Sequence, residues 1–148
     1  MRRRAGVIAI RDGEIALIER VRDGRRYWVL PGGGIEAGET AAQAAAREAR
    51  EELGVDVELG PMLVELLARH PDGTPGHHLY FAASLDNFDI RVVGPELEER
   101  DRSGTYCAVW VGLDALASMD VRPPEIATLI VRHRDGRWPE GLRIEVSD

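Results

Sequence analysis

Residues 41–53 constrain the fold of this chain most, because the segment AAQAAAREAREEL contains mainly strong helix formers. Thr40 is a good N-cap for a helix that begins at the next residue, and Gly54 stands where a helix C-cap belongs. A glycine-rich stretch, PGGG at residues 31–34, precedes this helix and predicts a turn or loop. We therefore expect a helix over residues 41–53 that follows a glycine loop.

Three glutamates, Glu48, Glu51 and Glu52, share one face of the expected helix, because they are three and four residues apart. Two ionised carboxylates about 4 Å apart repel each other by roughly 4 kcal/mol at an effective dielectric constant near 20. A hard divalent cation with oxygen ligands, Mg²⁺ or Mn²⁺, would offset this repulsion. The simpler interpretation is a solvated acidic face on which Arg47 and Arg50 pair with the glutamates.

The spacing within residues 33–55 resembles the signature of the Nudix hydrolases, G-x5-E-x7-R-E-U-x-E-E-x-G-U, in which U is a bulky aliphatic residue. The fixed glycines, glutamates and arginine all match. Ala49 departs from the pattern because it is smaller than the usual aliphatic residue, and it predicts a core that is either locally looser or differently filled at that point.

The resemblance implies catalytic and metal-ligating roles for Glu48, Glu51 and Glu52. It also implies that the carbonyl group of Gly32 is a metal ligand. Glycines suit such a role, because they allow backbone groups to approach an ion or a phosphate closely.

The resemblance further implies structural support from Glu39 and Arg47, which would hold the loop against the helix as a bidentate pair. Some relatives supply an additional base or metal ligand from a later loop. The candidates in this chain are Glu96, Glu98 and Glu99. A loop carboxylate is more often plain solvated surface, so the choice among them stays open.

Short β-rich runs surround the helix. Residues 5–10 and 14–20 predict a hairpin across the Asp12-Gly13 turn. The other expected elements are strands at 27–30, 55–69, 77–85 and 105–111, a short helix at 113–119 and a helix at 124–133. This order predicts an α+β domain, an α/β/α sandwich with a mixed β-sheet between helices. The segment 134–148 has no assigned element.

The length of 148 residues, with 44% hydrophobic and 30% charged residues, predicts a single domain over residues 1–148. The net charge of −7 disfavours binding to a nucleic-acid polymer. No stretch approaches the roughly 20 apolar residues of a membrane span, and the N-terminus lacks the apolar run of an export signal. The single cysteine, Cys107, excludes an internal disulfide framework and favours a cytoplasmic location. We expect Cys107 to be buried as a small apolar residue.

These residues and the resemblance together predict an enzyme that hydrolyses a nucleoside diphosphate linked to another moiety, with Mg²⁺ or Mn²⁺ as the cofactor. ADP-ribose and normal or oxidised nucleoside triphosphates are substrates of this class. The alternative is a catalytically inactive module that senses nucleotides or binds a partner, but such modules typically lose one of the signature acids. The sequence selects no specific substrate or substrate-binding residue, and it leaves open whether the chain forms a homodimer.

Overall fold

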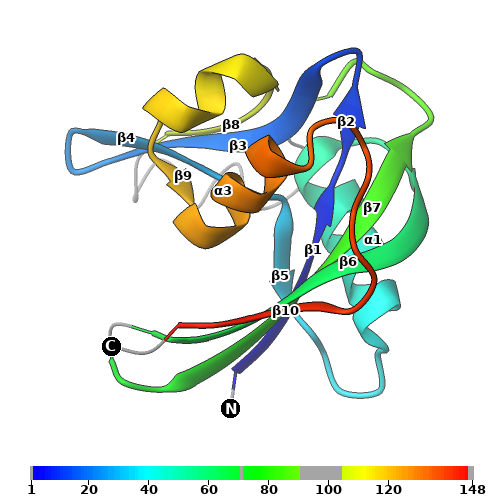
Figure 1. The fold of residues 1–148 in the computed structure, drawn as a ribbon, viewed down its shortest axis with the longest axis vertical. Coiled ribbons are helices and arrows are strands. Elements are labelled where there is room, and N and C mark those ends of the chain that lie inside the picture. The colour runs from blue at the N-terminus through cyan, green and yellow to red at the C-terminus, as the bar shows by residue number, and fades with distance from the viewer. Residues whose placement is uncertain (1, 71, 91–104, 147–148) are drawn as a thin grey trace.

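The computed structural model describes residues 2–70, 72–90 and 105–146, which form the two sheets and the helices drawn in Figure 1. In chain order the elements are β1 (Arg2–Ile8), β2 (Ile10–Arg11), β3 (Glu14–Arg22), β4 (Arg25–Val29), β5 (Gly32–Gly34), α1 (Ala41–Leu53), β6 (Val57–Arg69), β7 (Pro75–Leu85), β8 (Thr105–Gly112), the 3₁₀ helix η1 (Leu113–Ser118), β9 (Val121–Arg122), α3 (Pro124–Arg132) and β10 (Leu142–Glu145). The predicted α+β class is confirmed, and α1 has the predicted bounds. No helix in the described part of the chain is long and apolar enough to span a membrane.

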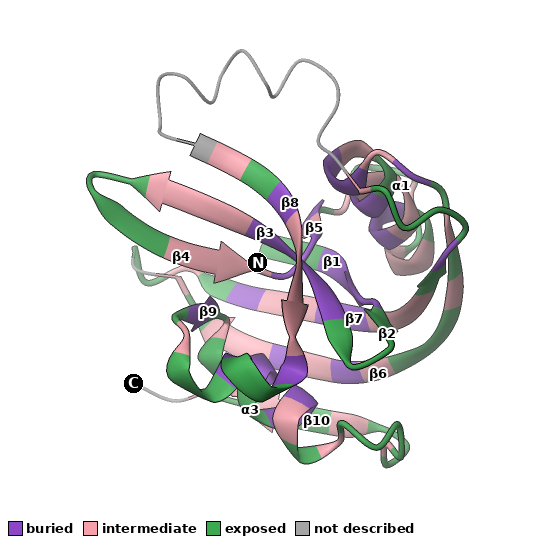
Figure 2. Cartoon of the chain, turned by 90° about the horizontal axis from the view of Figure 1, so that it is seen from above, coloured by how far each residue is buried: buried purple, intermediate pink, exposed green. Residues whose placement is uncertain are grey.

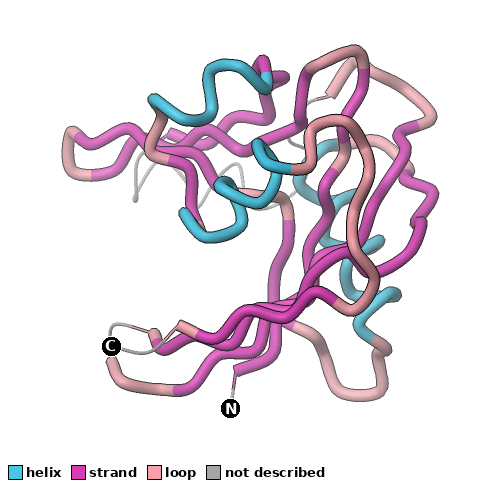
Figure 3. The backbone as a smooth tube through the Cα atoms, viewed as in Figure 1, coloured by secondary structure: helices cyan, strands magenta, loops and turns pink. Residues whose placement is uncertain are grey.

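Both sheets are mixed. In the first sheet the strand order is β10-β6-β7-β1-β5, and the pairs β1–β7 and β10–β6 are parallel. In the second sheet β3 pairs with β2, β4 and β8, and β9 extends β4 in parallel. The structure therefore divides between two sheets the strands for which the sequence predicts one. Figure 3 shows how much of the backbone these strands make up.

The expected hairpin is only partly correct. Asp12 and Gly13 have φ angles of 51° and 77°, which suit the tight turn that the sequence predicts. However, β2 alone pairs with β3 across this turn, whereas β1 pairs with β5 and β7 in the first sheet. An alternating apolar pattern identifies a strand but not its partner, so the chain's change of sheet near Ala9 left no trace in the pattern.

The C-terminal segment supplies an edge strand that the sequence did not predict. β10 pairs in parallel with β6 through residues such as Ile144, which lies beside Leu66. Trp138 and Ile144 both pack against the apolar cluster that includes Leu66. β6 is one continuous strand, and its pairing with β7 shifts register between Leu59 and Val64.

Helices α1 and α3 lie on different sides of the strands, as the view in Figure 2 shows. The inner face of α1 is built from small residues, and Ala45 and Ala49 are fully buried against Ala5 and Val7 of β1. Because both surfaces are small, the helix can approach the strand closely, and this packing fills the space that a larger residue would take at position 49. On the side of α3, Ile126 and its neighbours pack in a second apolar cluster.

Cys107 is exposed, so the expectation of a buried thiol is wrong. It lies on β8 next to Ala108, which is buried. Successive side chains of a strand point to opposite faces. Because position 108 faces the core, position 107 faces outward.

Candidate active site

Both ends of α1 are fixed by local hydrogen bonds. The backbone N–H of Gln43 donates to Thr40 Oγ1 at 3.1 Å, and the N–H of Thr40 donates to Gln43 Oε1 at 2.9 Å. This reciprocal capping box satisfies two backbone donors that the first turn leaves free. At the other end Gly54 adopts a left-handed φ of 74°, and its N–H donates to the carbonyl of Arg50. These caps determine where the helix begins and ends, and so which residues face the glycine strand β5.

Glu52 is the buried carboxylate of the site, with a relative exposure of 6%. The N–H of Gly32 donates to its Oε1 at 3.0 Å, and the hydroxyl of Tyr106 donates to its Oε2 at 2.7 Å. Burial raises the pKa of Glu52 to about 8, because it disfavours the charged form; nearby Glu48 raises it further, and the two hydrogen bonds oppose the rise. The ionised form of Glu52 is therefore unfavourable in free energy unless a nearby positive charge stabilises it.

Glu48 lies directly against the backbone of β5. A Cβ atom added to Gly33 would overlap the carboxyl group of Glu48. Gly33 therefore owes its identity to close approach rather than to backbone freedom. The neighbouring Gly32 is held between Ala5 and Gly6 of β1, and a side chain there would meet their backbone.

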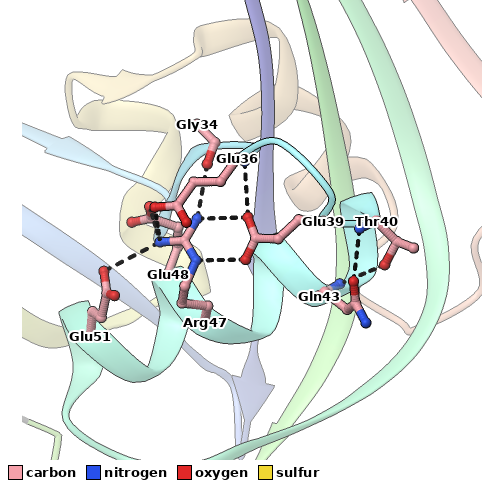
Figure 4. Close-up of polar contacts among 8 residues, drawn as sticks. All are labelled: Gly34, Glu36, Glu39, Thr40, Gln43, Arg47, Glu48 and Glu51. Carbon is pink, nitrogen blue, oxygen red and sulfur yellow. Dashed lines mark hydrogen bonds and ion pairs between the residues drawn. The ribbon is translucent and has the colours of Figure 1, made fainter.

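Arg47 joins the helix to the loop that precedes it, as Figure 4 shows. Its Nε and Nη2 atoms donate to the two carboxyl oxygens of Glu39 at 2.7 and 3.0 Å, and Nη2 also donates to the carbonyl of Gly34 at 3.0 Å. The hydrogen bond from Arg47 is the main reason that the pKa of Glu39 falls to about 2. The bidentate geometry is the one that the resemblance implies for this pair.

Arg47 also contacts two of the predicted metal-binding carboxylates. Its Nη1 lies 2.8 Å from an oxygen of Glu48 and 3.5 Å from an oxygen of Glu51 (Figure 4). Among the described residues, no three His, Cys, Asp or Glu side chains converge closely enough to bind an ion as they stand. Glu48 and Glu51 would have to turn from Arg47 toward Glu52 to bind one together.

The donor set fits a hard divalent cation. The side chains are carboxylates, and Glu52 accepts two hydrogen bonds from neutral donors while forming no ion pair within the described residues. The ionised carboxylate of Glu52 can accept further bonds, because such a group offers about four lone-pair sites. Oxygen ligands of this kind suit Mg²⁺ and Mn²⁺.

One residue of the site was not predicted from the sequence, and three predicted candidates cannot be placed. Tyr106 was missed, because it lies 54 positions from Glu52 and no motif connects them. The candidates for an additional base or ligand, Glu96, Glu98 and Glu99, lie outside the described residues.

The chain is similar to several known proteins. A model of the NUDIX domain matches residues 1–130. The phosphatase NudJ of Escherichia coli K12 is 30% identical over 130 residues, which cover 86% of this chain and 80% of NudJ. A NUDIX hydrolase from Nitrosomonas europaea has a similar structure, with a TM-score of 0.77 at 20% identity over 99% of this chain and 79% of the other. A MutT NUDIX hydrolase from Burkholderia pseudomallei gives a TM-score of 0.61 at 29% identity over 76% of this chain and 84% of its own.

Proposed function

Since the chain belongs to the NUDIX hydrolase family, we propose that it hydrolyses a nucleoside diphosphate linked to another moiety, X, in a reaction that depends on Mg²⁺ or Mn²⁺. Water attacks one phosphorus of the diphosphate and the bridging P–O bond breaks. The products are a nucleoside monophosphate and P–X. ADP-ribose and nucleoside triphosphates, including oxidised ones, belong to this substrate class.

Glu48, Glu51, Glu52 and the carbonyl of Gly32 would hold the ion. The observation that carries this proposal is the burial of Glu52 against β5, with Glu48 packed on the adjacent Gly33. When bound, the ion supplies charge neutralisation for the diphosphate and polarises the phosphoryl oxygens.

The chain's own residues contribute positioning and proton transfer. Arg47 and Glu39 hold the glycine strand against α1, so that the backbone and the carboxylates keep a fixed separation. A carboxylate of the acidic set deprotonates the attacking water, a role typically worth 10²–10⁴-fold in rate. The candidates for this base are Glu48, Glu51 and Glu52, together with Glu96, Glu98 and Glu99.

The substitution Glu52→Gln tests the proposal. The amide has the same shape and can keep both contacts, accepting from Gly32 and donating to the oxygen of Tyr106, but it is a poor ligand for a hard cation. We expect turnover to fall by at least about a hundredfold with the fold unchanged by circular dichroism. Glu58→Gln, an exposed position on β6, is the matched control and should retain full turnover.

The assay combines a panel of nucleotide substrates with Mg²⁺ and with Mn²⁺, and chromatography identifies the products. Wild-type turnover in Glu52→Gln would contradict the assignment of this carboxylate. Nucleotide binding without any product would favour the alternative of a sensing module.

A second candidate reaction is the release of orthophosphate, since the relative NudJ bears the name phosphatase. Product analysis separates the two reactions. Orthophosphate with a nucleoside diphosphate identifies terminal phosphate release, whereas a nucleoside monophosphate with P–X identifies cleavage within the diphosphate.

A further inference from the structure

Glu52 is connected to both sheets. Its Oε1 accepts from Gly32 on β5 in the first sheet, and its Oε2 accepts from Tyr106 on β8 in the second sheet. Each oxygen thus has one donor, on a different side of the carboxyl group. Two donors fixed in different sheets restrict the rotation of the carboxylate about its Cγ–Cδ bond.

Tyr106 is itself held in place. It lies opposite Arg20 in the antiparallel pairing of β3 with β8, and the guanidinium carbon of Arg20 is 5.1 Å from the centre of its ring. The pairing continues from Thr105 to Gly112, so the backbone that carries Tyr106 is anchored along its length. The hydroxyl group therefore reaches Glu52 from a fixed base and not from a freely moving side chain.

We propose that Tyr106 is a positioning residue for the metal-binding carboxylate of Glu52. The inference depends on the proposed function, because it requires Glu52 to be a ligand. The hydroxyl of Tyr106 occupies one lone pair of Oε2 and restricts the plane of the carboxylate, and the remaining lone pairs would be available to hold an ion. Hydrogen-bond partners of this kind commonly account for 10–100-fold in metal affinity or activity.

A purely structural role makes a different prediction. Tyr106 also satisfies a buried polar group, which by itself favours the folded state. If that were all, its loss would lower the thermal stability of the metal-free protein but leave the affinity for the metal unchanged. Metal affinity measured without substrate is therefore the decisive readout.

The experiment measures the dissociation constant for Mn²⁺ from the electron paramagnetic resonance signal of the free ion. Tyr106→Phe keeps the ring and removes the hydroxyl group, and we expect Mn²⁺ to bind about tenfold more weakly. Tyr27→Phe on β4 is the matched control, since its ring lies 4.1 Å from the guanidinium carbon of Arg122 and is not bonded to Glu52. In the background of Glu52→Gln, the change Tyr106→Phe should have no further effect.

The outcomes separate this inference from the proposed function. If Glu52→Gln weakens Mn²⁺ binding but Tyr106→Phe does not, the positioning role is wrong and the proposed function stands. If Glu52→Gln binds Mn²⁺ as tightly as the wild type, Glu52 is not a ligand, and both its assignment in the proposed function and the positioning role of Tyr106 are wrong. An equal loss from Tyr106→Phe with and without Glu52 would also overturn the positioning role.

A crystal of the wild type with Mn²⁺ decides the question if Tyr106→Phe does not fold. The hydrogen bond from Tyr106 to Glu52 should persist in the metal-bound protein. A Glu52 side chain that binds the ion only after leaving Tyr106 would contradict the inference.

Discussion

Glu39 and Glu52 lie near opposite ends of one short segment, and their surroundings shift their pKa values in opposite directions. Glu39 receives a bidentate arginine, and the hydrogen bond from that arginine lowers its pKa to about 2. Glu52 is buried between neutral donors, and burial raises its pKa to about 8. The chain thus supplies a cation to the first carboxylate and forms no ion pair with the second among the described residues.

This difference distinguishes a structural contact from the proposed metal-binding site. A carboxylate that has its own arginine needs nothing more to stay charged, so the pair of Glu39 and Arg47 serves to hold the loop. A buried carboxylate with a raised pKa gains most from an external cation. Glu48 and Glu51 also contact Arg47, and they would have to exchange this arginine for the ion.

Of the predictions that test the contrast between Glu39 and Glu52, Gly33→Ala should have the largest effect. The new methyl group would overlap the carboxyl group of Glu48 and push it away from β5. We expect turnover to fall by at least about tenfold, because a displacement of about 1 Å at a catalytic group can cost a hundredfold. Gly34→Ala is the matched control, since a Cβ atom there meets no heavy atom within 4 Å. Equal turnover in the two variants would show that Glu48 does not act from this position.

A smaller effect concerns the free energy of unfolding. Its dependence on pH should have opposite signs for the contributions of Glu52 and Glu39. The folded-state pKa of Glu52 is raised from 4.5 to about 8, so its contribution is fully present below pH 4.5 and is lost as the pH rises toward 8. Without metal, Glu52→Gln should therefore be more stable than the wild type at pH 8, by on the order of 2 kcal/mol, and the advantage should vanish below pH 4.5. Chemical denaturation at each pH measures it, and Mg²⁺ should stabilise the wild type alone.

The contribution of Glu39 to stability should depend on pH in the opposite direction and more weakly. Its folded-state pKa is lowered from 4.5 to about 2, so its contribution is present above pH 4.5 and is lost as the pH falls toward 2. Glu39→Gln should be less stable than the wild type near neutral pH, and the difference should shrink in acid. The effect is the smaller one, because partly solvated ion pairs contribute little. Parallel pH profiles for the two variants would contradict the contrast between these carboxylates.

The sequence predicted the parts of the site that depend on local rules. The bounds of α1 follow from Thr40, Gly54 and the helix formers between them, and the shared face of the glutamates follows from their spacing. The reciprocal contacts of Glu39 and Arg47 agree with the geometry that the resemblance implied.

The parts that depend on contacts between distant segments could not be predicted. Tyr106 reaches Glu52 because β8 pairs with β3, and a pattern of apolar residues does not say which strands pair. β10 was missed for the same reason, since its parallel pairing with β6 needs no turn between them that the sequence could reveal. The contacts of Arg47 with Glu48 and Glu51 depend on side-chain rotamers, which spacing alone does not determine.

The most direct test of the account is an anomalous difference map of crystals soaked in Mn²⁺ and a non-hydrolysable nucleotide. The account predicts a peak within coordination distance of carboxylate oxygens of Glu48, Glu51 and Glu52, next to the carbonyl of Gly32. Arg47 should then have released Glu48 and Glu51 while keeping Glu39. A map in which Arg47 still contacts Glu48 and Glu51, with no Mn²⁺ beside Glu52, would contradict the account.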